Sequence, residues 1–352
     1  MSVSSVSTAT LSTGLQQTVA RLQSQLNIVS SESSTGTLAD IGLTLGAQSG
    51  QDVALHQQLA DLNAISDSNS LVTTQLTTTA NALTTLQTSA SSMLSQIIDG
   101  LSSTPGSTGA MGVAQAAAGA LESFTTTMNA EVGGAYVFGG VNSGVAPMAA
   151  YAQTPSSAAQ TAVDAAFQAT FGMSPTSSSV STITGSTMTS FLDTQFSALF
   201  SGSNWTANWS SASSTAQTSR IGANDVTTTS VSANQMAFQQ MAEALTMVSE
   251  FGGSNLSSDA YSALMTKAES VINQASSGLT EVNAEVGVMQ NRLTDATSSI
   301  SLQVNVLTTQ IGAKEDVNSY DVTSQVTNLT NQLQVAYSLT SQIHKLSLVN
   351  FL

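Results

Sequence analysis

The sequence holds few side chains that could do chemistry, and they lie far apart. It has no cysteine and two histidines, His56 and His344. A zinc site needs several converging ligands, and neither histidine has a second His or Cys at ligand spacing, so we expect no metal site. The lack of Cys excludes disulfides and thiolate nucleophiles. No nucleophile elbow of the Gly-x-Ser-x-Gly type follows a predicted strand, so we expect no catalytic residue, no cofactor and no enzyme.

Two further groups of residues invite a functional interpretation. The acidic pair Glu315 and Asp316 precedes the last predicted helix, where carboxylates favour the free backbone amides of a helix N-terminus. Capping is the main interpretation of this pair, and contact with a neighbouring subunit is the alternative. Trp205 and Trp209 could together anchor a carbohydrate or a protein surface, but a small core cluster is the more ordinary interpretation.

The composition narrows the classes of function. The 352 residues include 6 Lys and Arg against 21 Asp and Glu, for a formal charge of −15. Because nucleic-acid binding needs clustered cations, we expect no nucleic-acid partner. No apolar stretch is long enough to span a bilayer, so we expect no membrane insertion, and the first residues lack the features of a cleaved secretory signal. Only 8% of the residues are charged, which predicts a neutral, hydroxyl-rich surface suited to structure or assembly.

Apolar residues recur every few positions over long stretches, with the period of one face of an α-helix. The first such stripe covers residues 11–29, and a longer one covers residues 52–97. A helix of the second length would be roughly 65 Å long. It is stopped by the segment around Pro105, since proline lacks the amide that a continuing helix needs. Residues 110–131 have the pattern of a third helix.

The middle of the chain differs from its two ends. Helical periodicity disappears over residues 133–224, where Tyr136–Phe138 and Val180–Ile183 have the pattern of short β-strands. Amphipathic stripes then return, and the last two cover residues 300–311 and 322–346. The chain is therefore expected to be helical at both ends.

These patterns predict a mainly α protein. Its N- and C-terminal segments form a long coiled-coil helical bundle, and a β-rich middle domain is inserted between them. We divide the chain into a terminal coiled-coil core segment (1–50 and 312–352), a helical rod domain (51–140 and 225–311) and an inserted β-leaning outer domain (141–224).

Short motifs at both ends of the chain point to one family. The C-terminal stretch runs from Ile-Gly-Ala-Lys-Glu-Asp-Val at 311–317 through Gln-Leu-Gln-Val-Ala-Tyr at 332–337 to Leu-Ser-Leu-Val-Asn-Phe-Leu at 346–352. The N-terminal half contains Ser-Ser-Thr-Gly at 33–36 and Tyr-Val-Phe-Gly-Gly at 136–140. Together these motifs resemble the flagellin superfamily, most closely its hook–filament junction branch, the third hook-associated proteins. An Asp and an Arg that the family has near the first helix break are missing here.

The resemblance implies a non-enzymatic, secreted structural subunit of the bacterial flagellum. Such a subunit would pass through the flagellar type III export channel without a cleaved signal peptide, served by a flagellar export chaperone, and would be extracellular. It would self-associate in a ring and adapt hook to filament, in contact with a neighbouring hook-associated protein and with flagellin. A filament flagellin is the alternative within the family, and a secreted adhesin that uses its middle domain is the alternative outside it.

The terminal stripes are the part of the chain best suited to assembly. A narrow apolar seam between only two helices is marginal, so we expect the termini to fold on assembly, where contacts with neighbours offset the cost of ordering. The predicted assembly interface consists of Leu15, Leu22, Leu26, Leu329, Leu333, Ile343 and Leu346.

Overall fold

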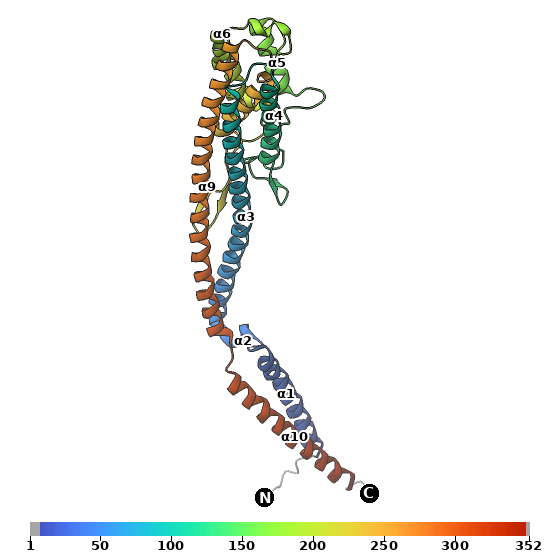
Figure 1. Ribbon diagram of the computed structural model, residues 1–352. Helices are drawn as coiled ribbons and strands as arrows, with labels where there is room; N and C mark the ends of the chain where they lie inside the picture. The colour runs from blue at the N-terminus through green and yellow to red at the C-terminus, as the bar shows by residue number, and fades with distance from the viewer. Residues whose placement is uncertain (1–7, 350–352) are drawn as a thin grey trace. The chain divides into compact units, whose positions relative to one another are not determined.

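The computed structural model describes residues 8–349, and the side-chain surroundings of residues 10–343. The chain divides into two compact units, which we call the terminal unit (residues 1–63 and 301–352) and the central unit (residues 64–300). The finer division into three domains stays a prediction. Figure 1 shows the elements in chain order, from blue near the N-terminus to red near the C-terminus.

Helices dominate the described residues. They are α1 (Thr8–Thr35), α2 (Ile41–Leu45), α3 (Ser49–Gly100), α4 (Thr108–Met128), α5 (Ala158–Phe171), α6 (Gly185–Phe191), α7 (Gly202–Asn208), α8 (Met236–Phe251), α9 (Ser258–Glu315) and α10 (Ser319–Val349). Two small antiparallel sheets pair β1 (Glu131–Val132) with β2 (Ala135–Tyr136), and β3 (Thr218–Arg220) with β4 (Val226–Thr228). The prediction of a mainly α fold is confirmed. Within the described part of the chain, no helix has the length and hydropathy needed to cross a membrane.

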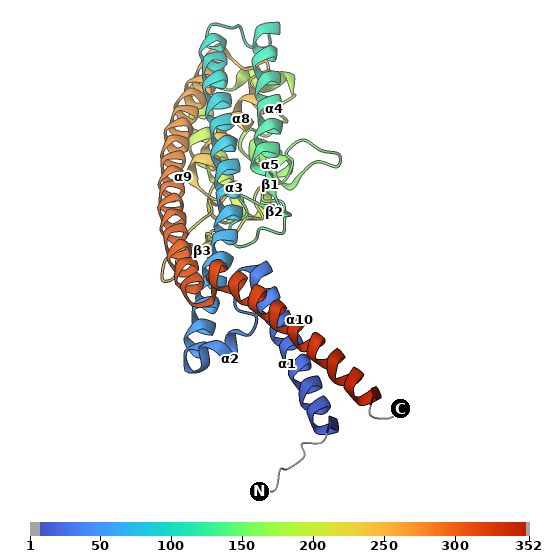
Figure 2. The same ribbon diagram turned by 90° about the horizontal axis from the view of Figure 1, so that it is seen from below.

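In the terminal unit, α1 and α10 lie side by side and run in opposite directions (Figures 1 and 2). The first helix ends where the sequence predicts, at Gly36, whose φ of +76° is a left-handed conformation that favours glycine. The Gly36 N–H donates to Glu32 O at 2.9 Å and closes the last turn. The short α2 follows and is capped by Asp40, whose Oδ1 accepts from the Leu43 N–H at 2.8 Å.

The segments that leave α1 and α9 pair with each other inside the terminal unit. The Leu38 N–H donates to Glu315 O at 2.8 Å, and the Val317 N–H donates to Gly36 O at 2.9 Å. Backbone groups exposed by the ends of the two helices thereby find partners in each other, as buried backbone groups must.

The predicted capping of the last helix by the acidic pair is wrong. Glu315 is still the last residue of α9, and α10 begins only at Ser319. The capping contact comes from Asn318, whose Oδ1 accepts from the Tyr320 N–H at 3.1 Å. The Glu315 carboxylate instead contacts the imidazole of His56, with Oε1 2.8 Å from Nε2.

The central unit is organised around one hydrophobic core. Side chains of α3, α4, α8 and α9 that the sequence places on apolar stripes meet there, and Figure 2 shows these helices alongside one another. Leu76, Leu83, Phe124, Phe238 and Phe251 are among the largest side chains that are fully buried. Their burial supplies the main favourable term for folding of this unit.

The two tryptophans lie in the same core. Trp205 is 0% exposed and Trp209 is 2% exposed, and their rings stack with centroids 5.8 Å apart. The Trp205 Nε1–H donates to Asn234 Oδ1 at 3.0 Å, as a buried indole requires. The core interpretation of this pair is confirmed, and neither ring is free to anchor an external ligand.

The middle of the chain holds more helix than predicted. Residues 180–183, expected as a strand, lie in and just after a 3-10 turn, Ser178–Thr182. Val180 and Ile183 are both buried, and side chains three apart share one face of a 3-10 turn, whereas a strand would turn them to opposite faces. Ser177 caps the turn, because its Oγ accepts from the Ser179 N–H at 3.2 Å. Local hydroxyl capping and core contacts therefore decide the structure here, rather than β-propensity.

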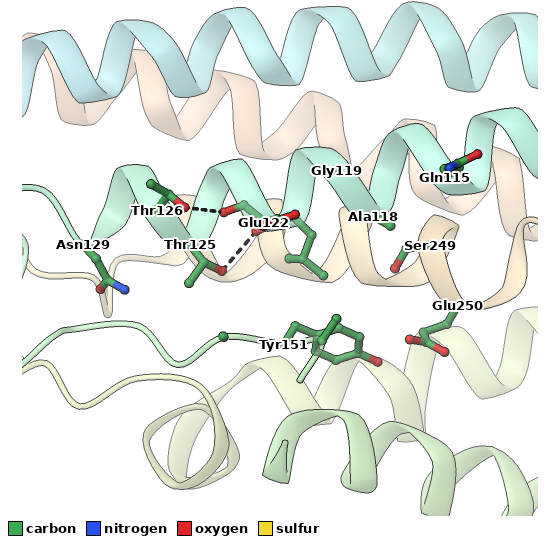
Figure 3. Close-up of a pocket in the computed structure, with 13 residues that line it drawn as sticks. Gln115, Ala118, Gly119, Glu122, Thr125, Thr126, Asn129, Tyr151, Ser249 and Glu250 are labelled. Atoms are coloured by element: carbon green, nitrogen blue, oxygen red, sulfur yellow. Dashed lines mark hydrogen bonds between the residues drawn. The ribbon is translucent and has the colours of Figure 1, made fainter. Parts of the chain in front are cut away.

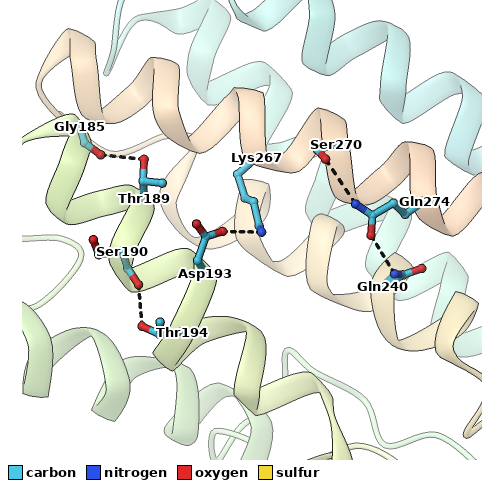
Figure 4. A network of polar contacts seen from close by, with 9 residues as sticks. All are labelled: Gly185, Thr189, Ser190, Asp193, Thr194, Gln240, Lys267, Ser270 and Gln274. Atoms are coloured by element: carbon cyan, nitrogen blue, oxygen red, sulfur yellow. Dashed lines mark hydrogen bonds and ion pairs between the residues drawn. The ribbon is translucent and has the colours of Figure 1, made fainter.

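Polar contacts on the surface tie α9 to the middle segments (Figure 4). Lys267 Nζ of α9 lies 2.5 Å from Asp193 Oδ1, in a π-helical turn that continues α6. Further along α9, Gln274 Oε1 accepts from Gln240 Nε2 of α8 at 3.0 Å. Exposed ion pairs contribute little to stability. The stability of the central unit therefore comes mainly from its buried core, and these polar contacts help to orient the surface segments.

Candidate assembly surface

The contact between α1 and α10 is a narrow apolar seam. Leu22, Leu333 and Ala336 form its buried centre, and each is 6% exposed. Partly buried side chains pack against this centre: Val19, Leu26 and Leu329. A polar contact flanks the seam, since Gln23 Nε2 donates to the Tyr337 hydroxyl at 2.7 Å. Two helices alone bury few residues, so the pair depends on each of these contacts.

The structure places the predicted interface residues in different surroundings. Leu22 and Leu333 are buried within the chain, in the seam, while Leu15, Leu26, Leu329 and Ile343 are half-buried. Leu346 falls in α10, but its side chain lies outside the described part, as does that of His344. Leu22 and Leu333 therefore hold α1 and α10 together within one chain, and the role of all seven residues in assembly stays a prediction.

Further large apolar side chains of both helices lie at the surface of the chain. These large apolar residues are half or more exposed, or close to it: Leu11, Ile28, Tyr320, Val335, Tyr337 and Leu339. A shallow groove of about 290 Å³ beside the seam adds amide groups from Gln25, Gln325 and Gln332. Apolar groups that a lone chain leaves in water are typical of surfaces that become buried in a complex.

The same surface carries almost no charge. Over the whole length of α1 the sequence has one cation and one anion, Arg21 and Glu32, and α10 has Asp321 and Lys345 beside His344. Charged groups are costly to desolvate when a surface is buried. The α1–α10 pair can therefore be packed against other chains at little electrostatic cost, with register set by apolar shape and amide hydrogen bonds.

One group of metal-ligating side chains forms in the terminal unit. His56 Nε2 lies 2.8 Å from Glu315 Oε1 and 3.9 Å from Asp52 Oδ2. The hydrogen bond to Glu315 raises the pKa of His56 above its ordinary value, since the carboxylate stabilises the imidazolium. Within residues 10–343, whose side chains the structure describes, this is the only group of three His, Asp or Glu side chains close enough together to hold a metal ion.

Sequence reasoning missed this group. Glu315 is 259 residues from His56 in the chain, so no local motif could show their contact. The available signal was the spacing of Asp52 and His56, which puts both side chains on one face of α3 one turn apart. The expectation that no ligand surrounds His56 rested on His and Cys alone and left out the carboxylates.

A larger hollow lies in the central unit between α4, α8 and the segment around Tyr151, with a volume of about 820 Å³ (Figure 3). Burial raises the pKa of both Tyr151 and Glu250, which favours their neutral forms. The lining also includes Glu122 and Thr125 but no Lys, Arg or His. The lining therefore offers amide and hydroxyl groups beside two carboxyl groups, Glu122 and Glu250, and no cation to pair with them.

Comparisons with known proteins agree with the helical ends. The bacterial flagellin N-terminal helical region matches residues 6–143, and the bacterial flagellin C-terminal helical region matches residues 270–352. No curated protein matches the chain. Among solved structures, a Vibrio parahaemolyticus protein assigned as a flagellar hook-associated protein is similar, with a TM-score of 0.52 and 10% identity. The match covers 76% of this chain and 97% of that one, and at such low identity it concerns the fold alone.

The two flagellin regions take in the elements that build the seam and the long helices beside it. Residues 6–143 include α1 to α4, and residues 270–352 include most of α9 and all of α10. The middle of the chain, which supplies α5 to α8, lies outside both matches. The chain therefore belongs to the bacterial flagellin family, whose members are non-enzymatic structural subunits of the flagellum.

Proposed function

We propose that this chain is the adaptor between the flagellar hook and the filament, and that it assembles as a ring through α1 and α10. The observation that carries the proposal is the α1–α10 pair itself. Its seam is satisfied within the chain, while its outer faces present apolar side chains and few charges. A pair of this kind gains stability when further helices cover it.

Two observations favour the hook-associated branch over other flagellar subunits. The fold is shared with a protein assigned as hook-associated over 97% of that protein's length. The C-terminal sequence motif at 346–352 also resembles that branch. The partners proposed on this basis are a second copy of the chain, a neighbouring hook-associated protein, flagellin, and an export chaperone before secretion through the type III channel.

The filament subunit is the second candidate. It is supported by the matches at both ends, which are to helical regions described as those of bacterial flagellin. In a filament the same faces of α1 and α10 would pack against many copies of one chain, whereas in a junction ring they would also contact chains of other kinds.

The deciding experiment is electron microscopy of a strain that lacks this gene, combined with an immunoassay for flagellin in the medium. Bare hooks with flagellin shed as monomer would support the adaptor. Absent or shortened filaments without shed flagellin would make the chain the filament subunit. Intact flagella would contradict both assignments.

A further inference from the structure

We propose that Asp52, His56 and Glu315 form a binding site for one transition-metal dication, Zn²⁺ being the best fit. The inference concerns the terminal unit alone and holds whether the chain is an adaptor or a filament subunit. It rests on how α3 and α9 bring three ligand types together, and on a buried carboxylate oxygen that lacks a partner.

The ligands converge from distant parts of the sequence. Asp52 and His56 lie one turn apart on the first turns of α3, and Glu315 is the last residue of α9. One ligand atom from each lies within 4.8 Å of the others, with His56 Nε2 at 2.8 Å from Glu315 Oε1 and 3.9 Å from Asp52 Oδ2. In a tetrahedral zinc site, bonds of about 2.1 Å put neighbouring ligand atoms about 3.4 Å apart, so modest side-chain rotations suffice.

Burial of Asp52 is the second observation. The residue is 3% exposed, and its Oδ1 has no hydrogen-bond partner. Leaving a buried carboxylate oxygen without a partner is costly, and such groups are normally hydrogen-bonded or bound to metal. A dication at this position would satisfy the carboxylate and offset the negative charge that Asp52 and Glu315 bring together.

The neighbouring cation does not fill this role. Lys314 precedes Glu315, and its Nζ donates to Gln51 Oε1 at 3.2 Å and to Gln48 Oε1 at 3.5 Å. The imidazole of His56 lies within 4 Å of both carboxylates, and the His56 side chain is 48% exposed. Solvent can thus reach the site, and water would complete the coordination of a bound ion.

The ligand set selects the class of ion. Imidazole together with carboxylates suits Zn²⁺ and the later first-row dications, whereas Mg²⁺ and Ca²⁺ need more oxygen ligands. Binding requires the neutral imidazole, so affinity should fall as the pH is lowered and His56 takes up a proton. A bound ion would connect the start of α3 to the end of α9, close to the backbone pairing of residues 36–38 with 315–317.

Isothermal titration calorimetry with ZnCl₂ and the full-length chain at about pH 7.5 tests the proposal. We expect one saturable site in the wild type and a loss of affinity of at least about tenfold in both His56→Gln and Asp52→Asn. His344→Gln is the matched control, because it removes the chain's other imidazole and should leave affinity unchanged. MgCl₂ should give no saturable heat at the same concentrations.

Circular dichroism of each variant shows whether it is folded, and His56→Gln is expected to fold because the side chain is half exposed. No saturable Zn²⁺ binding to the wild type would overturn the proposal. The proposal would also be overturned if folded His56→Gln bound Zn²⁺ with wild-type affinity. Equal losses of Zn²⁺ affinity in His56→Gln and His344→Gln would overturn it as well.

Discussion

The substitution Leu333→Ala tests whether the seam holds α1 against α10. Leu333 is 6% exposed and packs with Leu22 and Ala336 at the buried centre of the contact. Truncating a buried leucine costs about 2–5 kcal/mol, and a seam between two helices can partly close around the gap, so we expect the low end, about 2 kcal/mol. That loss shifts the equilibrium between a paired and an open α1 about 30-fold.

Amide hydrogen exchange followed by mass spectrometry measures this shift directly on the full-length chain. Peptides from α1 should exchange about 30-fold faster in Leu333→Ala than in the wild type, because exchange follows opening of the pair. Peptides from residues 64–300 should be unaffected, since the central unit has its own core. The readout thus separates local opening from global unfolding.

Leu339→Ala is the matched control. It removes the same atoms from the same helix, but Leu339 is 44% exposed, so α1 should keep wild-type exchange. Two results would refute the reasoning: unchanged α1 exchange in Leu333→Ala, or α1 amides that already exchange freely in the wild type. The second result would favour termini that fold only on assembly, as the narrowness of the stripes predicts.

Three further predictions follow from other contacts. Leu339→Ala should weaken assembly but leave the isolated chain unchanged. Reduced motility of a complemented strain would show the loss of assembly, and sedimentation of the purified chain would show that the chain itself is unchanged. The raised pKa of His56 means that its contact with Glu315 stabilises the folded terminal unit below the unfolded pKa, and that this contribution is lost as pH rises through the folded pKa. Thermal unfolding followed by calorimetry between about pH 6 and 8.5 should therefore show that the stability of the terminal unit declines as the pH rises. His56→Gln should not show this decline. Asn69→Ala should destabilise the central unit by about 1–3 kcal/mol in urea unfolding, because the 1% exposed Asn69 donates to Ile221 O at 3.0 Å.

Long periodic segments were predictable from the sequence, and the reason is physical. The apolar stripes at 11–29 and 52–97 lie in α1 and α3. An apolar residue every three or four positions over several turns forms one continuous face only in an α-helix. The end of α1 was predictable too, since Gly36 supplies the left-handed conformation that a helix end uses. Local signals of this strength need no knowledge of the rest of the chain.

Short segments and long-range contacts were not predictable in this way. Residues 180–183 have the pattern of a strand because Val, Thr and Ile favour strands, but burial of Val180 and capping by Ser177 favour a 3-10 turn over Ser178–Thr182. The partner of His56 could not be read at all, because only the folded chain brings Glu315 to it. Likewise, the apolar stripes predicted Leu22 and Leu333 as residues of an assembly interface, but they could not show that the two side chains pack together within one chain.

Along α3, hydroxyl side chains are far more frequent than charged ones. Exposed side chains along this helix donate to the carbonyl one turn before them, as in Ser70 to Ser66 O at 3.1 Å and Thr74 to Ser70 O at 3.0 Å. Thr78 repeats the pattern, donating to Thr74 O at 3.0 Å. A hydroxyl that already has a partner in its own helix leaves no donor stranded when another surface covers it, whereas a Lys or Glu there would have to be desolvated. A helix surface of this kind costs little free energy to bury, which is the property that a subunit of a packed assembly needs.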